Sequence, residues 1–140
     1  MPVGLSWDQA VALTPREAVR ALGKIVVEFD RPLDGRAAEP HGDRLLWVLL
    51  SSGAPVAEVR EVVGRAVVDG NVVVWQPEDG LEEVLRLLAQ VGGMLTFDLQ
   101  CDLLADERGT PVSSHAGPLH GIAGVRPGGI MRLWMRVEAG

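Results

Sequence analysis

The chain has 140 residues, of which 47% are apolar and 23% are charged, and its formal net charge is −6. This composition is typical of one globular domain, so we expect a single domain over residues 1–140, large enough to bury about two thirds of its unfolded surface. The acidic balance gives no uniform positive field for a phosphate backbone, and nucleic acid is not the expected partner. The single cysteine, Cys101, excludes an intramolecular disulfide and a cysteine-based zinc cluster.

The sequence predicts neither a targeting segment nor a membrane-spanning one. Its first twenty residues have neither a basic start followed by an apolar block nor a small-residue cleavage site. Apolar runs of about 18 residues, the length that a membrane-spanning helix needs, do not occur. Together with the lone cysteine, this predicts a cytoplasmic protein that does not bind a membrane.

Start and stop signals predict a helix near the N-terminus. Thr14 and Glu17 form a capping box, in which each side chain bonds the other residue's backbone amide, and Pro15 suits the first helical position. Gly23 can take the left-handed conformation common after a helix. A pattern of the same kind begins at Ser6. We expect a helix of about two turns that ends before Gly23.

Two strands and a loop are predicted next. Residues 25–29 form a short apolar strand, and residues 30–43 carry Pro, Gly and charges without an apolar period, which is typical of a surface loop. The run 44–50 is apolar on both faces, which favours a central strand covered on two sides. Trp47, inside this run, is therefore expected in the core.

A valine-rich stretch follows Pro55. Its valines recur at helical spacing and predict a helix, although valine is a mediocre helix former because its branched Cβ restricts χ1. The helix would end at Gly64 or Gly70. The valines in question are Val56, Val59, Val62 and Val63.

The segment around Asp69 and Gly70 permits either a tight hairpin or one strand that begins after a turn. Because the apolar run before Asp69 is short, we predict a single strand over 71–75, with Trp75 in the core.

The clearest helical pattern comes after this strand. Asp79 and Glu82 form a capping box, and Gly92 and Gly93 end the pattern. One side of the predicted helix is lined by apolar residues, namely Leu81, Val84, Leu85, Leu88 and Val91.

The period changes from 3.6 to 2 in the C-terminal third, which predicts two half-buried strands over 94–104 and 130–137. Their inward residues would be Leu95, Phe97, Leu99, Cys101 and Leu103 in the first strand, and Met131, Leu133, Met135 and Val137 in the second. With the preceding elements, this predicts an α+β fold: a mixed sheet of about five strands, helices mainly on one face, and an antiparallel C-terminal strand pair.

The outward side of this strand pair combines charged and aromatic residues. Antiparallel pairing would place Arg132 and Arg136 beside Asp98 and Asp102, with Trp134 between the arginines. Trp and Arg are the residue types most enriched at interface hot spots. We therefore predict a non-enzymatic accessory or adaptor module that binds another protein chain or forms a homodimer. In the competing interpretation, the N-terminal helices cover Trp134, with Trp7 or Leu22 packed against it, and the face is a second layer of core. A third possibility is a lone exposed tryptophan.

The Gly- and Pro-rich stretch 105–129 supports an alternative, since loops of this length are usually functional or disordered. In this alternative the protein is a small enzyme or ligand-binding domain whose general acid or base is His115 or His120. Asp102 or Asp106 would orient the imidazole, and the nucleophile would be Ser113, Ser114 or Cys101. Because the nucleophile-elbow pattern G-x-S-x-G is absent, we assign no catalytic residue.

The sequence predicts neither a metal site nor a cofactor. His115 and His120 are five residues apart, which matches no helical ligand pair, and His41 lies far away in the sequence. The glycines of 105–129 match neither a phosphate-binding P-loop nor a dinucleotide-binding turn. Cys101 falls on the inward phase of its strand, where a free cysteine is typically an inert core residue.

Overall fold

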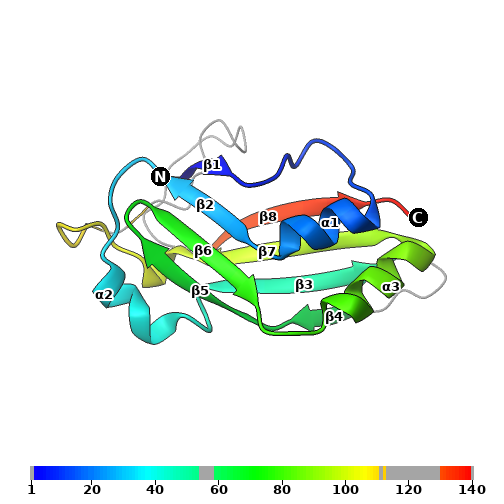
Figure 1. Cartoon of the computed structure of the whole chain (residues 1–140). Helices are drawn as coiled ribbons and strands as arrows, with labels where there is room; N and C mark the ends of the chain where they lie inside the picture. Colours follow the sequence, from blue (N-terminus) through cyan, green and yellow to red (C-terminus); the bar gives the residue numbers. More distant parts are fainter. Residues whose placement is uncertain (1, 54–58, 111, 113–129, 140) are drawn as a thin grey trace.

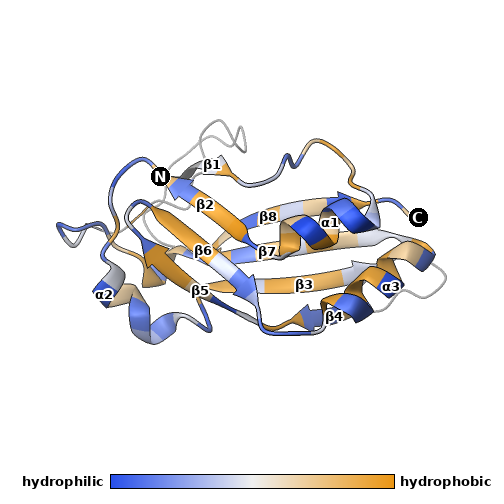
Figure 2. Ribbon diagram, viewed as in Figure 1, coloured by the Kyte–Doolittle hydropathy of each residue, from blue (hydrophilic) through white to orange (hydrophobic). Residues whose placement is uncertain are grey.

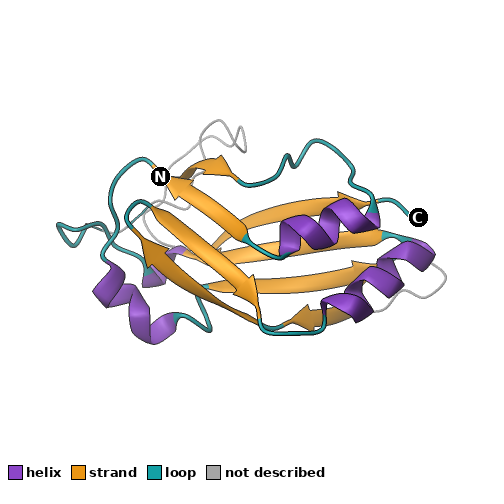
Figure 3. Cartoon of the chain, in the orientation of Figure 1, coloured by secondary structure: helices purple, strands orange, loops and turns teal. Residues whose placement is uncertain are grey.

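The computed structural model describes residues 2–53, 59–110, 112 and 130–139. Its strands form two antiparallel sheets of four strands each (Figure 3). Sheet A consists, in spatial order, of β1 (Pro2–Leu5), β2 (Ile25–Phe29), β6 (Val72–Pro77) and β5 (Gly64–Asp69). Sheet B consists of β4 (Val59–Val62), β3 (Leu46–Ser52), β7 (Gly93–Gln100) and β8 (Ile130–Val137). The α+β class is therefore confirmed, whereas the single mixed sheet of about five strands is wrong.

The helices and sheet A lie on the same side of sheet B (Figure 1). The helical elements are α1 (Pro15–Leu22), α2 (Gly35–Ala38), α3 (Leu81–Val91) and the short 3-10 turns η1 (Glu39–His41) and η2 (Cys101–Leu103). α1 contacts β8, and α3 contacts β3. α1, α3 and sheet A thus lie over the inner face of sheet B, while its outer face points away from them, and α2 packs against β5 of sheet A.

The predicted start of α1 is confirmed. The backbone N–H of Glu17 donates to Oγ1 of Thr14 at 3.2 Å, and the N–H of Thr14 donates to Oε1 of Glu17 at 3.1 Å. The end of α1 and the start of α3 differ from the prediction. Gly23 ends α1 in a right-handed conformation, with φ −61°, because its N–H still bonds carbonyls of the last turn. α3 begins after Gly80, whose φ is 84°, and no side chain caps it there, so the capping box predicted at Asp79 is not its start.

The valine stretch after residue 58 forms strands, so the predicted helix is wrong there; residues 54–58 lie outside the described part. Val62 is buried and pairs with Val48 of β3, and Ala66 is buried and pairs with Trp75 of β6. Valine's branched Cβ packs well on a pleated surface. Pairing with β3 and β6 therefore outweighs the weak helical spacing.

The hairpin that the sequence also permitted is present. Asp69 pairs with Val72, so β5 and β6 are joined by a tight turn through Gly70 and Asn71, and the single strand predicted for this region is wrong. Gly70 has φ 61°, a conformation that glycine adopts without strain. The side chain of Asn71 donates to the carbonyl oxygen of Phe29 at 3.0 Å, which ties the turn to β2.

The two sheets are joined at a sharp corner. Only Val63 separates β4 of sheet B from β5 of sheet A, so the chain passes directly from one layer to the other. The next residue, Gly64, lies against the ring of Trp75: a Cβ there would be 2.3 Å from a ring carbon and 2.5 Å from the carbonyl oxygen of Gln76. Only glycine fits this corner without displacing its neighbours.

The opposite side of the two layers is bridged by residues 6–13, which we call the N-terminal strap. Near its start, Oγ of Ser6 accepts from the N–H of Val26 in sheet A at 2.9 Å. At its end, the N–H of Leu13 donates to the carbonyl oxygen of Arg136, and the N–H of Glu138 donates to that of Leu13, both at 2.9 Å. The strap therefore links the edge of sheet A to the edge strand β8 of sheet B.

The core lies between the layers. Trp75 is 1% exposed, as predicted, and the rings of Trp7 and Phe97 pack with centroids 4.8 Å apart. Figure 2 shows the apolar middle sections of β2 and β6 that face this interior. Trp47, by contrast, is 41% exposed, so its predicted place in the core is wrong. Only one face of sheet B is covered, and Trp47 lies on the other.

α3, with 11 residues, is the longest helix of the described residues, and none of the helices found there has the length and apolar character needed to cross a bilayer.

Candidate functional site

The candidate site is the outer face of sheet B. Its members alternate along each strand with buried residues, because successive side chains of a strand point to opposite sides. They are Val59 and Glu61 of β4, Trp47, Leu49 and Ser51 of β3, Met94, Thr96, Asp98 and Gln100 of β7, and Ile130, Arg132, Trp134 and Arg136 of β8.

The strand register places these residues in rows across the sheet. In the central row, Leu49 pairs with Glu61 on one side and with Thr96 on the other, and Thr96 pairs with Trp134. This row therefore runs from an acidic residue at the β4 edge, through a leucine and a threonine, to an aromatic residue at the β8 edge.

The neighbouring row contains the ion pair that the sequence predicts. Trp47 pairs with Asp98, and Asp98 pairs with Arg132. Two nitrogens of Arg132 donate to the two carboxylate oxygens of Asp98, at 2.7 and 2.9 Å. These hydrogen bonds raise the pKa of the Arg132 guanidinium. The predicted contact is confirmed, and its bidentate geometry is the strong form of an arginine–carboxylate pair.

The second predicted contact is wrong. β7 ends at Gln100, and Asp102 lies in η2, whereas Arg136 pairs with Met94 at the opposite end of the ribbon. A nitrogen of Arg136 donates instead to the carbonyl oxygen of Ala10 in the strap, at 2.9 Å. The sequence pattern overestimated the length of β7 because its inward phase continues through Cys101, which is buried from within a 3-10 turn.

Trp134 is half-buried at the edge of the outer face. The strap satisfies both of its backbone groups: the N–H donates to Oε1 of Gln9, and the carbonyl oxygen accepts from Nε1 of Trp7, each at 2.9 Å. A hollow of about 880 Å³ lies between Trp134, Arg136 and residues 5–10. The helices, which the competing interpretation placed over this residue, lie along the inner side of the sheet (Figure 1).

The residues of the enzymatic hypothesis are not brought together in the described part of the chain. Ser114, His115 and His120 lie outside it, and Asp102 is exposed in η2. Cys101 is buried, as predicted, and burial raises the pKa of its thiol to about 12. It stays protonated near neutral pH and is a poor nucleophile.

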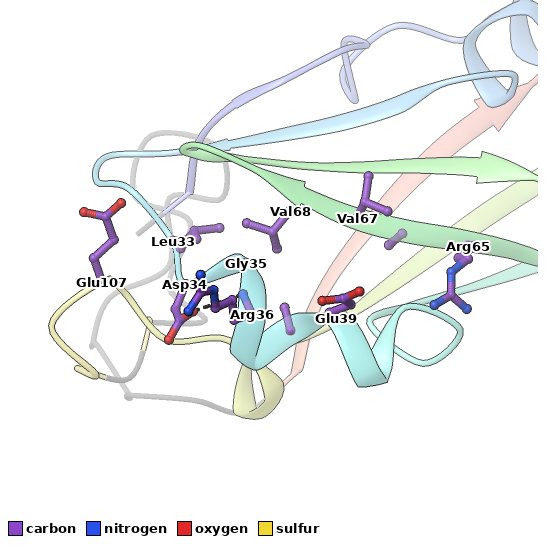
Figure 4. A pocket seen from close by; sticks show the side chains of 11 residues that line it. Leu33, Asp34, Gly35, Arg36, Glu39, Arg65, Val67, Val68 and Glu107 are labelled. Atoms are coloured by element: carbon purple, nitrogen blue, oxygen red, sulfur yellow. Dashed lines mark hydrogen bonds between the residues drawn. The ribbon is translucent and has the colours of Figure 1, made fainter.

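A second hollow, of about 580 Å³, lies between α2 and β5 (Figure 4), and the sequence did not predict it. Val67 and Val68 of β5 form one wall of this hollow, and the opposite wall begins at Asp34. The carboxylate of Asp34 accepts hydrogen bonds from the N–H groups of Arg36 and Ala37 and so caps α2. Basic and acidic side chains both border it. None of its lining residues is a serine, cysteine or histidine, so it presents no nucleophile and base pair. The cap at Asp34 was the only local signal of this element.

Among the residues that the structure describes, no three His, Cys, Asp or Glu side chains form a group that could hold a metal ion. Comparison of the chain with protein-family models, with curated proteins and with solved structures gave no match.

Proposed function

We propose that this protein is a non-enzymatic interaction module that binds protein through the outer face of sheet B and self-associates through it. One observation carries the proposal: Trp47, Leu49 and Met94, on the two central strands of this face, are 41%, 36% and 38% exposed. When one face of an antiparallel sheet is exposed to water, its strands normally alternate apolar residues on the buried face with polar residues on the exposed face. Apolar side chains at outward positions on both central strands favour a partner that removes them from water.

The size of the face is consistent with a reversible contact. Four strands at the usual spacing span about 19 Å, and seven residues of β3 span about 24 Å, which gives a flat footprint of roughly 450 Å². Stable interfaces bury about 800 Å² per partner, and transient ones less. The side chains that project from the sheet and the hollow beside Trp134 make the contact area larger than this flat footprint.

The polar residues of the face are also suited to burial. A charge transferred from water into an interface is costly unless it is paired and hydrogen-bonded. The charge of Arg132 is already paired within the face, because its guanidinium donates two hydrogen bonds to the carboxylate of Asp98. Trp134, beside this pair, is of the residue type that most often anchors interfaces.

Sedimentation velocity over a range of concentrations tests the proposal with matched variants. Leu49→Asp puts a charge at the centre of the face and should give a monomer, whereas Val67→Asp places the same charge at a 54% exposed position of sheet A and should behave as the wild type. Trp134→Ala should weaken association by about 2 kcal/mol, or about 30-fold, without unfolding the chain.

Two outcomes contradict the proposal. One is a wild-type protein that remains monomeric at every concentration. The other is equal disruption by Leu49→Asp and Val67→Asp, which would show a general effect of charge on solubility or folding and no specific role for this face.

A further inference from the structure

We infer that the partner on the outer face is a second copy of this chain, related by a two-fold axis that runs along the strands. The β8 edge of each copy then lies over the β4 edge of the other. This inference rests on the proposed function and specifies its partner and orientation.

The first support is the distribution of charge across the face. Glu61 is the acidic residue at the β4 edge, and it is exposed. Arg132 and Arg136 are exposed on β8 at the opposite edge, and the charge of Arg132 is compensated by Asp98. Among the residues of the face itself, the uncompensated charges are therefore negative at the β4 edge and positive at Arg136, and Asp8 of the strap borders the hollow beside Arg136.

The second support comes from symmetry. A two-fold contact uses the same surface on both copies, and packed sheets keep their strands within about 30° of each other. Only two orientations of the axis then remain. An axis across the strands would place β8 over β8 and bring Arg136 of both copies to the same edge. An axis along the strands places the negative edge over the positive edge, which Coulomb's law favours.

The third support is the register of the central row. Rotation about an axis between β3 and β7 brings Leu49 of one copy over Thr96 of the other, and Glu61 over Trp134. Arg136 lies two residues from Trp134 along β8, a distance of about 7 Å that its side chain can span. Glu61 of each copy thus reaches Arg136 of the other, and Leu49 is buried at the centre.

Charge reversal tests this orientation. Glu61→Arg and Arg136→Glu should each weaken self-association at least tenfold, because each creates two like-charge contacts per dimer. A mixture of the two variants should form heterodimers with nearly wild-type affinity, since both contacts then join opposite charges. Glu82→Arg, on an exposed position of α3, is the matched control and should not change association.

Thermal unfolding of each variant shows whether it is folded, which matters for Arg136→Glu because it loses the bond to Ala10. The inference is overturned if the mixture associates no better than either variant alone while Leu49→Asp still yields a monomer. In that case the face is the right one and the orientation is wrong. Retention of association in Leu49→Asp would refute the proposed function as well.

Discussion

The indole N–H of Trp7 donates a hydrogen bond to the carbonyl oxygen of Trp134 at 2.9 Å, across 127 positions of sequence. Oε1 of Gln9 accepts from the N–H of the same Trp134. Side chains of the strap thus occupy the backbone groups that a further strand would use to add to β8 at this position. Because unpaired strand edges recruit other strands, this capping favours the outer face over the edge as the surface that meets a partner.

Loss of the Gln9 side chain should destabilise the fold. Gln9→Ala removes the Oε1 atom that accepts from the partly buried N–H of Trp134, and the loss of a buried hydrogen-bond partner costs about 1–3 kcal/mol. Gln76→Ala, at an exposed position of β6, should change the free energy of unfolding by no more than about 0.5 kcal/mol. Urea denaturation measures the free energy of unfolding of both variants. Equal midpoints for the two variants would show that the strap does not hold this edge.

The corner between the sheets should tolerate only glycine. Gly64→Ala would force its Cβ to within 2.3 Å of the Trp75 ring, and overpacking of this kind costs about 1–3 kcal/mol or more. Gly35→Ala is the control, because the nearest atom to its new Cβ is 3.6 Å away, an ordinary contact. Chemical denaturation should show a large loss in the free energy of unfolding for Gly64→Ala and none for Gly35→Ala. A wild-type midpoint for Gly64→Ala would contradict the close packing at this corner.

Asp106 should contribute acid-sensitive stability. Hydrogen bonds from the N–H of Thr110, from Arg31 and from the N–H of Arg108 hold the pKa of its carboxyl below the usual value. A pKa that is lower in the folded state gives stability that is fully present well above the unfolded value of about 3.9 and is lost as the pH falls through the folded value.

Asp106→Asn should therefore be less stable than the wild type at pH 6, and the difference should shrink as the pH falls below about 4. Denaturation midpoints measured from pH 6 to pH 2.5 give this comparison. Asp43→Asn, in an exposed loop position, should follow the wild-type curve. A pH-independent difference between Asp106→Asn and the wild type would show that the carboxylate charge is not involved.

Local signals in the sequence were enough for several elements. The reciprocal capping of Thr14 and Glu17 depends on residues three apart, so it could be predicted without knowing the fold. The period-2 pattern of the two strands put Asp98 and Arg132 on the same outward face, whereas the register that places them opposite each other came from the structure, because a shift of two residues would bury the same apolar faces. The role of residues 113–129 stays a prediction, since they lie outside the described part of the chain.

The sequence by itself determined which strand residues alternate and where α1 begins, because these properties depend on neighbouring residues alone. The tertiary structure decided that the valines after residue 58 form strands, that Trp47 faces outward and that Arg136 contacts the strap and not Asp102. Each of these outcomes depends on which element pairs with or covers another. That choice is set by the burial and hydrogen bonding of segments far apart in the chain, and no local pattern contains it.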